Sequence, residues 1–146
     1  LFGVQIEKRN ILSLLKGKDS NLERDLITKH LVKGGNISID DFFEIFGSNS
    51  NEEFVSKIQK HYNLSDYLKE TYTKTNSMID FEVAFDKFIS KSYLKRLKNI
   101  PLSLGSIFHF ILTAEYEWDN IKRIAYGKRY NFSLERIKSM LVLETE

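Results

Sequence analysis

Cysteine is absent from this sequence, and proline occurs only once, as Pro101. Without cysteine the chain has no disulfide framework and no thiolate metal site, and its composition fits a reducing compartment. Because proline is the residue that most often interrupts a helix, a chain with one proline leaves long stretches free to be helical.

Long apolar runs are also missing. The longest run in the middle of a predicted helix is Ile107–Leu112, and His109 interrupts it. A membrane span needs about 20 apolar residues, so no segment qualifies, and no signal-peptide pattern is visible. The chain begins at Leu1 already in helical pattern, and we therefore expect a fragment of a longer protein that lacks an N-terminal portion.

The composition is that of a globular domain. The chain has 146 residues, of which 42% are hydrophobic and 29% charged. This length is enough for one domain with a core, and we expect one helical region over residues 1–146. The formal net charge is only +2, so no strong overall field attracts the protein to nucleic acid or to a membrane.

Helix signals recur along the chain, and no segment alternates with period two long enough to predict a strand. Three serines are each followed, three residues later, by a carboxylate, the capping-box spacing: Ser20, Ser38 and Ser50. Gly34-Gly35 would close the helix that begins after Ser20. We expect further helices over residues 80–99 and 102–126, and a last one capped by Ser133. The predicted fold is all-α.

An internal repeat is the most informative feature of the sequence. Residues 6–18 align with residues 116–128, and five of the thirteen aligned positions are identical. The residue numbers of every aligned pair differ by the same amount, which we call the repeat offset. The five identical positions pair Glu7 with Glu117, Asn10 with Asn120, Ile11 with Ile121, Gly17 with Gly127, and Lys18 with Lys128. The fold is thus predicted to be a helical bundle of about one and a half pseudo-repeats, with the second beginning near residue 101. Two similar amphipathic helices that match by coincidence are the alternative.

The repeated residues have a structural interpretation. Glutamate and asparagine three apart lie on one helix face. Asparagine is unfavourable inside a helix, so an asparagine kept at both places is expected to bind a neighbouring turn or helix end. The glycine is predicted to end the helix, and the lysine to neutralise its last carbonyls.

The last third of the chain resembles the C-terminal end of the C subunit of V/A-type rotary ATPases, which is equivalent to the d subunit of the eukaryotic enzyme. The resemblance rests on a proline-led apolar helix, an E-x-E-x-x-N-I-x-x-I motif, a G-K turn and a closing amphipathic helix. In this sequence the motif and turn are Glu115, Glu117, Asn120, Ile121, Ile124, Gly127 and Lys128. The N-terminal stretch resembles an earlier repeat of that family, which is built of repeated helical units.

The resemblance implies a non-catalytic protein of the central stalk that binds no nucleotide and needs no cofactor. Such a protein couples the rotating shaft to the membrane ring that moves protons or sodium ions. The implied partners are the central-shaft subunits and the proteolipid ring. The implied location is peripheral, on the cytoplasmic face of the membrane, without insertion.

No residue pattern indicates catalysis or metal binding. The three histidines, His30, His61 and His109, are too far apart in sequence to form a metal pair on one helix. Gly34-Gly35 lacks the Lys-Ser/Thr of a phosphate loop. An unrelated helical enzyme domain, with its site in the missing portion, stays a rival interpretation.

Two basic clusters could bind an acidic partner, or could simply be solvated helix faces. The candidate docking residues are Lys91, Lys95, Arg96, Lys122, Arg123 and Arg129. Aromatic residues such as Tyr126 lie among them, so a helical module for single-stranded nucleic acid, using residues 87–98 and 122–129, is the alternative function. The nearly neutral net charge argues against nucleic acid as a partner.

Overall fold

The computed structural model describes residues 1–62, 64, 68, 72, 74–98 and 104–143. These residues form helices, turns and loops, and no strand occurs among them, which confirms the all-α prediction. Within the described part, no helix is both long and apolar enough to cross a membrane. The chain divides into two compact units, residues 1–85 and 86–146, which are described separately.

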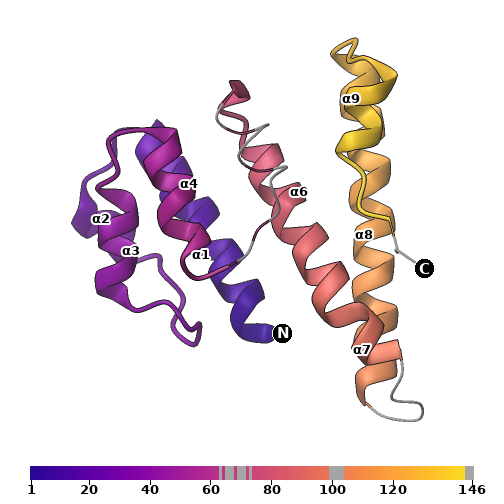
Figure 1. The fold of residues 1–146 in the computed structure, drawn as a ribbon, viewed down its shortest axis with the longest axis horizontal. Helices are drawn as coiled ribbons and strands as arrows, with labels where there is room; N and C mark the ends of the chain where they lie inside the picture. Colours follow the sequence, from indigo (N-terminus) through magenta and orange to yellow (C-terminus); the bar gives the residue numbers. More distant parts are fainter. Residues whose placement is uncertain (63, 65–67, 69–71, 73, 99–103, 144–146) are drawn as a thin grey trace. The chain divides into compact units, whose positions relative to one another are not determined.

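Figure 1 shows the helices of the first unit that the described residues define along their length, and the first part of α6, which continues into the second unit. These are α1 (Phe2–Asp19), α2 (Arg24–Thr28), α3 (Ile39–Phe46), α4 (Asn51–Gln59) and the first two turns of α6 (Met78–Ile89). Helix α1 contacts α2 and α3, and α3 contacts α4. Between α4 and α6, the Phe54 and Phe81 rings meet edge to face at 5.6 Å, a preferred aromatic geometry.

Two serines begin helices of the first unit as their sequence spacing predicts. The Ser38 hydroxyl accepts the Asp41 amide at 3.1 Å and begins α3. The Ser50 hydroxyl accepts the Glu53 amide at 3.2 Å and begins α4. Each bond satisfies an amide that has no partner within its own helix.

Two other boundary predictions are wrong. Ser20 does not begin a helix but is the C-cap of α1, and α2 starts after Glu23, whose side chain makes no cap hydrogen bond. Gly34-Gly35 does not close that helix, because α2 ends at Thr28. Gly34 instead adopts a φ of 113°, a conformation that favours glycine, in the loop between α2 and α3.

The second unit continues α6 through a π-helical segment, η1 (Ser90–Leu94), into α7 (Lys95–Lys98). It then contains α8 (Leu104–Arg129) and α9 (Leu134–Ser139), which folds back along α8 (Figure 1). The helix predicted over residues 80–99 is therefore observed with a π-helical interruption, and Ser133 caps α9 as predicted. The predicted start of the second repeat, near residue 101, lies outside the described residues.

Candidate functional site

Two helical hairpins carry the residues that the repeat singled out. Hairpin 1 comprises α1, α2 and the chain as far as Val32, and hairpin 2 comprises α8, α9 and the chain as far as Val142. In each hairpin a long helix is followed by a turn and a short helix that packs against it. The chain after the short helix then runs back along the long helix. Hairpin 1 belongs to the first unit and hairpin 2 to the second.

One asparagine in each long helix binds the returning chain. The Asn10 side chain donates to the Val32 carbonyl and accepts the Val32 amide, both at 2.8 Å. The Asn120 side chain donates to the Val142 carbonyl at 2.7 Å and accepts the Val142 amide at 2.9 Å. We call this paired bonding the asparagine clamp. It satisfies the backbone amide and carbonyl of one residue that follows the short helix.

A glycine in each long helix allows the short helix to come close. A Cβ atom at Gly17 would lie 2.5 Å from Cδ1 of Ile27, and one at Gly127 would lie 2.6 Å from Cγ1 of Ile137. Both distances are shorter than carbon atoms tolerate. The isoleucine of the short helix thus packs directly on the backbone of the long helix.

The glycines do not end the helices, contrary to the sequence interpretation. Helix α1 continues to Asp19 and α8 to Arg129. The residues that reverse the chain are Asn21, with a φ of 51°, and Asn131, with a φ of 55°. Asparagine tolerates this left-handed conformation because its short polar side chain can bond locally.

The hydrogen bonds at these turns form a Schellman motif in both hairpins. Gly17 accepts the Leu22 amide and Gly127 accepts the Phe132 amide, each at 2.9 Å. The lysine after each glycine supplies its backbone carbonyl to the left-handed asparagine. Every one of these contacts recurs at the repeat offset, so the two hairpins share their internal geometry.

Glu7 fixes the chain beyond hairpin 1. Its carboxylate is fully buried, and one oxygen accepts the Asn36 amide and, at 2.6 Å, the Ile37 amide. Its counterpart, Glu117, is exposed. The matching amides would fall at and just past the end of the sequence, outside the described residues. The predicted backbone bonds of Glu117 therefore stay a prediction.

Hairpin 2 has a buried ion pair at a position where hairpin 1 has a serine. Arg123 donates to an Asp86 carboxylate oxygen on α6 at 2.7 Å, and both side chains are buried. Arg123 also reaches the Asn120 side-chain oxygen at 3.5 Å, so the ion pair adjoins the asparagine clamp. Burial, and then the neighbouring Asp86 charge, raises the pKa of the Tyr116 hydroxyl far above its ordinary value, so Tyr116 is neutral.

Arg123 is therefore not a docking residue. Its guanidinium is buried and bonded within the second unit, so it is not available to an outside partner. The sequence interpretation placed it on the surface because its neighbours are basic. Ser13, its counterpart, bonds the Arg9 carbonyl within α1 at 2.9 Å.

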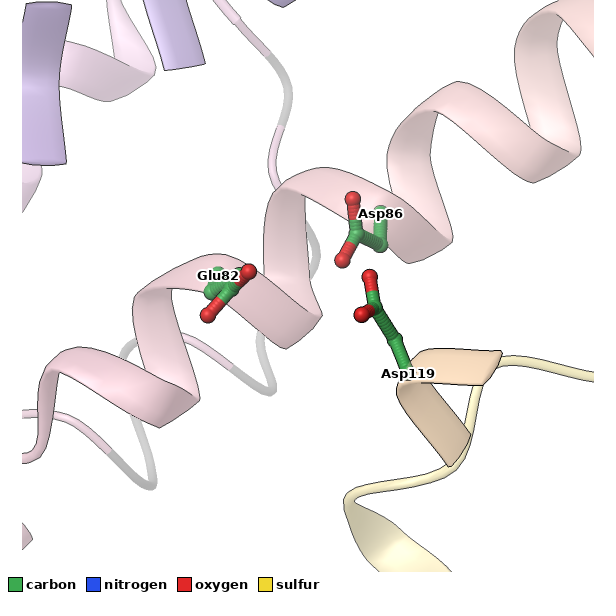
Figure 2. Close-up of side chains that lie close together, drawn as sticks. All are labelled: Glu82, Asp86 and Asp119. Carbon is green, nitrogen blue, oxygen red and sulfur yellow. The ribbon is translucent and has the colours of Figure 1, made fainter. Parts of the chain in front are cut away.

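Asp119 lies close to this ion pair. Figure 2 shows the Asp86 and Asp119 carboxylates pointing toward each other, with Glu82 one turn earlier on α6. One oxygen of Asp86 and one of Asp119 lie within 4.8 Å of each other. Arg123 neutralises Asp86, and Lys122 bonds Asp119 at 2.5 Å. Two local cations thus balance the two carboxylates, and the pair is explained without a metal ion.

The other candidate docking residues differ in their surroundings. Lys91 and Arg96 are exposed, and the side chain of Lys95 lies outside the described part. Lys122 is exposed but paired with Asp119, while the exposed Arg129 lies over the Tyr130 ring at 5.9 Å. The basic surface of α8 is therefore smaller than the sequence suggested, which does not favour the nucleic-acid alternative.

Sequence reasoning did not find several residues of these hairpins. Val32 and Val142, which the asparagines bind, contribute only backbone atoms to these bonds and leave no sequence signal. Asn21 and Asn131 did carry a signal, because asparagine after the end of a helix is typical of a left-handed cap, and they align at the same offset.

Comparisons with known proteins agree with one another. Residues 1–140 match the family model described as "ATP synthase (C/AC39) subunit". The chain is 30% identical over 139 residues to the C subunit of the A-type ATP synthase of Thermoplasma acidophilum, covering 95% of this chain and 39% of that protein. It is 29% identical over 143 residues to the corresponding protein of Methanocaldococcus jannaschii, covering 96% of this chain and 36% of that protein. No solved structure gives a significant match. The chain thus spans about two fifths of the length of the curated relatives that it matches.

Proposed function

Because the chain belongs to the ATP synthase (C/AC39) subunit family, we propose that it forms part of a non-catalytic stalk subunit of an A-type rotary ATP synthase. In this role it couples the rotating shaft to the membrane ring. The partners are the shaft subunits and the proteolipid ring, and the protein lies at the membrane periphery, on the cytoplasmic face. The family match over residues 1–140 carries the proposal.

The geometry of the hairpins supports a mechanical rather than a chemical role. Three of the polar side chains that the repeat singles out bind backbone groups of the same chain: Asn10 and Asn120 each hold one valine of the returning chain, and Glu7 accepts two amides. Side chains used in this way fix the returning chain to the long helix. Close-packed interiors resist compression, so such a body transmits force with little deformation.

Co-purification from native membranes tests this proposal. An affinity tag is placed on the chromosomal copy, the membranes are dissolved in a mild detergent, and the captured proteins are identified by mass spectrometry. We expect the catalytic-head, shaft and proteolipid subunits of the rotary complex, retained through a salt wash. The same tag on an unrelated helical protein is the control. Recovery without any of these subunits would contradict the proposal.

A second measurement tests the non-catalytic role. The purified chain is expected to hydrolyse no ATP by itself. Removal of the whole protein from the purified complex is expected to leave hydrolysis by the catalytic head in place while ion pumping stops. Hydrolysis by the isolated chain, with a rate that follows its concentration, would contradict this role.

A further inference from the structure

A groove runs along one side of α1 in the first unit. Its volume is about 610 Å³, and the residues that line it all belong to that unit. They include three cations and three apolar side chains: Lys8, Arg9, Lys16, Ile6, Leu12 and Val32. None of the described residues that line the groove is acidic. The groove therefore suits an occupant that carries both apolar and acidic side chains.

The corresponding face of α8 is covered within the second unit. Three residues that line the groove have counterparts there at the repeat offset, in the pairs Ile6 with Tyr116, Arg9 with Asp119, and Ser13 with Arg123. Arg123 binds Asp86 at 2.7 Å, and Tyr116, which is 6% exposed, lines a small cavity together with Leu94 of η1. Helix α7 also contacts α8 (Figure 1). Residues 86–98, which we call the preceding segment, therefore cover this face of α8.

The preceding segment comes before α8 in the chain, so its counterpart would come before α1. Asp86, shifted back by the repeat offset, would stand before residue 1. The curated relatives have additional length, since about three fifths of each lies outside the matched region. Because the last third of this chain resembles the C-terminal end of its family, we place that additional length before residue 1. In repeat proteins each unit buries its open face against its neighbour, which an earlier segment would supply here.

We propose that the groove of α1 receives a helical segment that precedes residue 1 in the full-length polypeptide and covers α1 as the preceding segment covers α8. The contacts that support this proposal each lie within one unit: the groove within the first, and the covered face of α8 within the second. Such a segment would be present whether or not the protein couples a shaft to a ring, so its occurrence does not depend on the proposed function.

The charges of the two faces differ, and this difference predicts the side chains of the occupant. On α8 the cation is Arg123, and its partner in the preceding segment is Asp86. At the matching position α1 has the uncharged Ser13, and the cation Arg9 lies one turn earlier. In the part of the chain that the structure describes, the Arg9 side chain makes no ion pair. The occupant is therefore expected to face Arg9 with a carboxylate and Ile6 with apolar side chains.

Cysteine labelling of the full-length gene product tests the proposal. The chain described here has no cysteine, so a single cysteine within it reports one place. Ser13→Cys and Ile6→Cys each place a thiol in the groove. Asp25→Cys is the control, because Asp25 on α2 and its counterpart Glu135 in hairpin 2 are both exposed. Each variant is reacted with a maleimide in the 146-residue chain and in the full-length protein, alone and at low concentration, with any other cysteine replaced by serine. Circular dichroism checks that each variant keeps its helix content.

In the full-length protein the two groove thiols should react at least about tenfold more slowly than in the 146-residue chain, because a covered thiol reacts only through local opening. The thiol of Asp25→Cys should react equally in both. Equal rates for the groove thiols in the two proteins overturn the proposal. Groove thiols that already react tenfold more slowly than the control in the 146-residue chain are covered by that chain itself, which also overturns it. Protection that rises with protein concentration assigns the groove to a second copy, and protection only in the assembled complex assigns it to a different protein; both results overturn the proposal.

A charge reversal tests the carboxylate expected on the occupant. Arg9→Glu, added to Ser13→Cys in the full-length protein, should weaken the protection by about threefold, the effect of losing one partly exposed ion pair. Arg9→Lys keeps the positive charge and should keep the protection. Protection that Arg9→Glu leaves unchanged overturns the assignment of a carboxylate opposite Arg9.

Discussion

Hairpin 1 and hairpin 2 have the same internal geometry but different surroundings. Both use an asparagine clamp, a glycine under an isoleucine and a left-handed asparagine at the turn. Outside these contacts they differ. Hairpin 1 uses a buried glutamate to fix the chain that follows, whereas hairpin 2 uses a buried arginine to bind α6.

This difference separates what a hairpin needs from what its neighbours need. The asparagines and glycines shared at the repeat offset act within the hairpin. Arg123, which stands where hairpin 1 has Ser13, instead binds α6, outside the hairpin. The shared asparagines and glycines therefore record the local fold, while the change from Ser13 to Arg123 records a contact that only hairpin 2 makes.

The largest expected effect is the loss of the buried ion pair, which belongs to hairpin 2. Arg123→Ala removes the guanidinium that neutralises the buried Asp86 carboxylate, which we expect to destabilise the second unit by about 3–5 kcal/mol. Ser13→Ala, the matched change in hairpin 1, removes only a bond within α1 and should change stability by less than about 0.5 kcal/mol. Urea unfolding followed by helix circular dichroism measures both.

A double variant separates the buried charge from lost packing. Arg123→Met combined with Asp86→Asn removes both charges while keeping most of the volume, and it should recover much of the stability that Arg123→Ala loses. If the double variant is less stable than Arg123→Ala, the buried charge is not the reason for the loss.

The second effect tests the clamps, which both hairpins share. Asn10→Ala and Asn120→Ala each leave the amide and carbonyl of one valine without their partners, and should each cost about 1–3 kcal/mol. Thermal melts of the two variants compare them directly.

The control for the clamps is Asn10→Asp. The aspartate keeps the oxygen that accepts the Val32 amide, but it turns its other oxygen toward the Val32 carbonyl and buries a charge, so it should lower the melting temperature at least as much as Asn10→Ala. Unchanged or higher melting temperatures for both alanine variants would mean that the clamps hold nothing in place.

The sequence predicted much of this arrangement, for reasons that particular residues make clear. The capping serines Ser38, Ser50 and Ser133 act over three residues, so local spacing identifies them. Ser20 has the same spacing but lies just before Asn21, whose left-handed turn ends α1, so a competing local signal set the boundary. The repeat identified Asn10 and Asn120 because these residues act through their side chains, and the sequence specifies side chains directly.

The partners of those residues could not be predicted in the same way. Val32 and Val142 act through their backbones, and any residue other than proline offers the same groups. Arg123 looked like a surface residue because Lys122 precedes it, and its burial depends on Asp86, which lies 37 residues away in the chain. Contacts at such a separation leave no periodic signal in one sequence.

The third effect tests whether both glycines act through close packing. Gly17→Ala and Gly127→Ala push a Cβ atom into Ile27 and Ile137, at a cost of about 1–3 kcal/mol. Alanine is the better helix former by about 1 kcal/mol, so the net loss should be about 1 kcal/mol at each site. Similar losses of stability in the two hairpins, measured by urea unfolding, would show that the two glycines have the same role.

Two further variants serve as controls for the glycines. A Cβ atom at Gly3, on the same helix, would meet its nearest neighbour at an ordinary 3.6 Å, so Gly3→Ala should be neutral or stabilising. Adding Ile27→Val to Gly17→Ala removes the atom that the new methyl group meets first, and should cost less than the two changes sum to. Strict additivity would show that the two side chains do not collide.

The smallest effect concerns the start of the short helices, where the hairpins differ. The Ser133 hydroxyl accepts the Arg136 amide at 3.2 Å and caps α9, whereas Glu23 precedes α2 without a side-chain cap bond. A missing cap leaves an amide of the first turn without a side-chain acceptor. Glu23→Ser should therefore supply that acceptor and stabilise hairpin 1 by about 0.5–1 kcal/mol, while Ser133→Ala should destabilise hairpin 2 by about 1 kcal/mol. Thermal melts of both variants measure the two changes, with Ser139→Ala, whose hydroxyl bonds the Arg136 carbonyl within α9, as a control near the other end of that helix. If Glu23→Ser lowers the melting temperature, the glutamate contributes through its charge near the start of α2, and the two hairpins begin their short helices by different means.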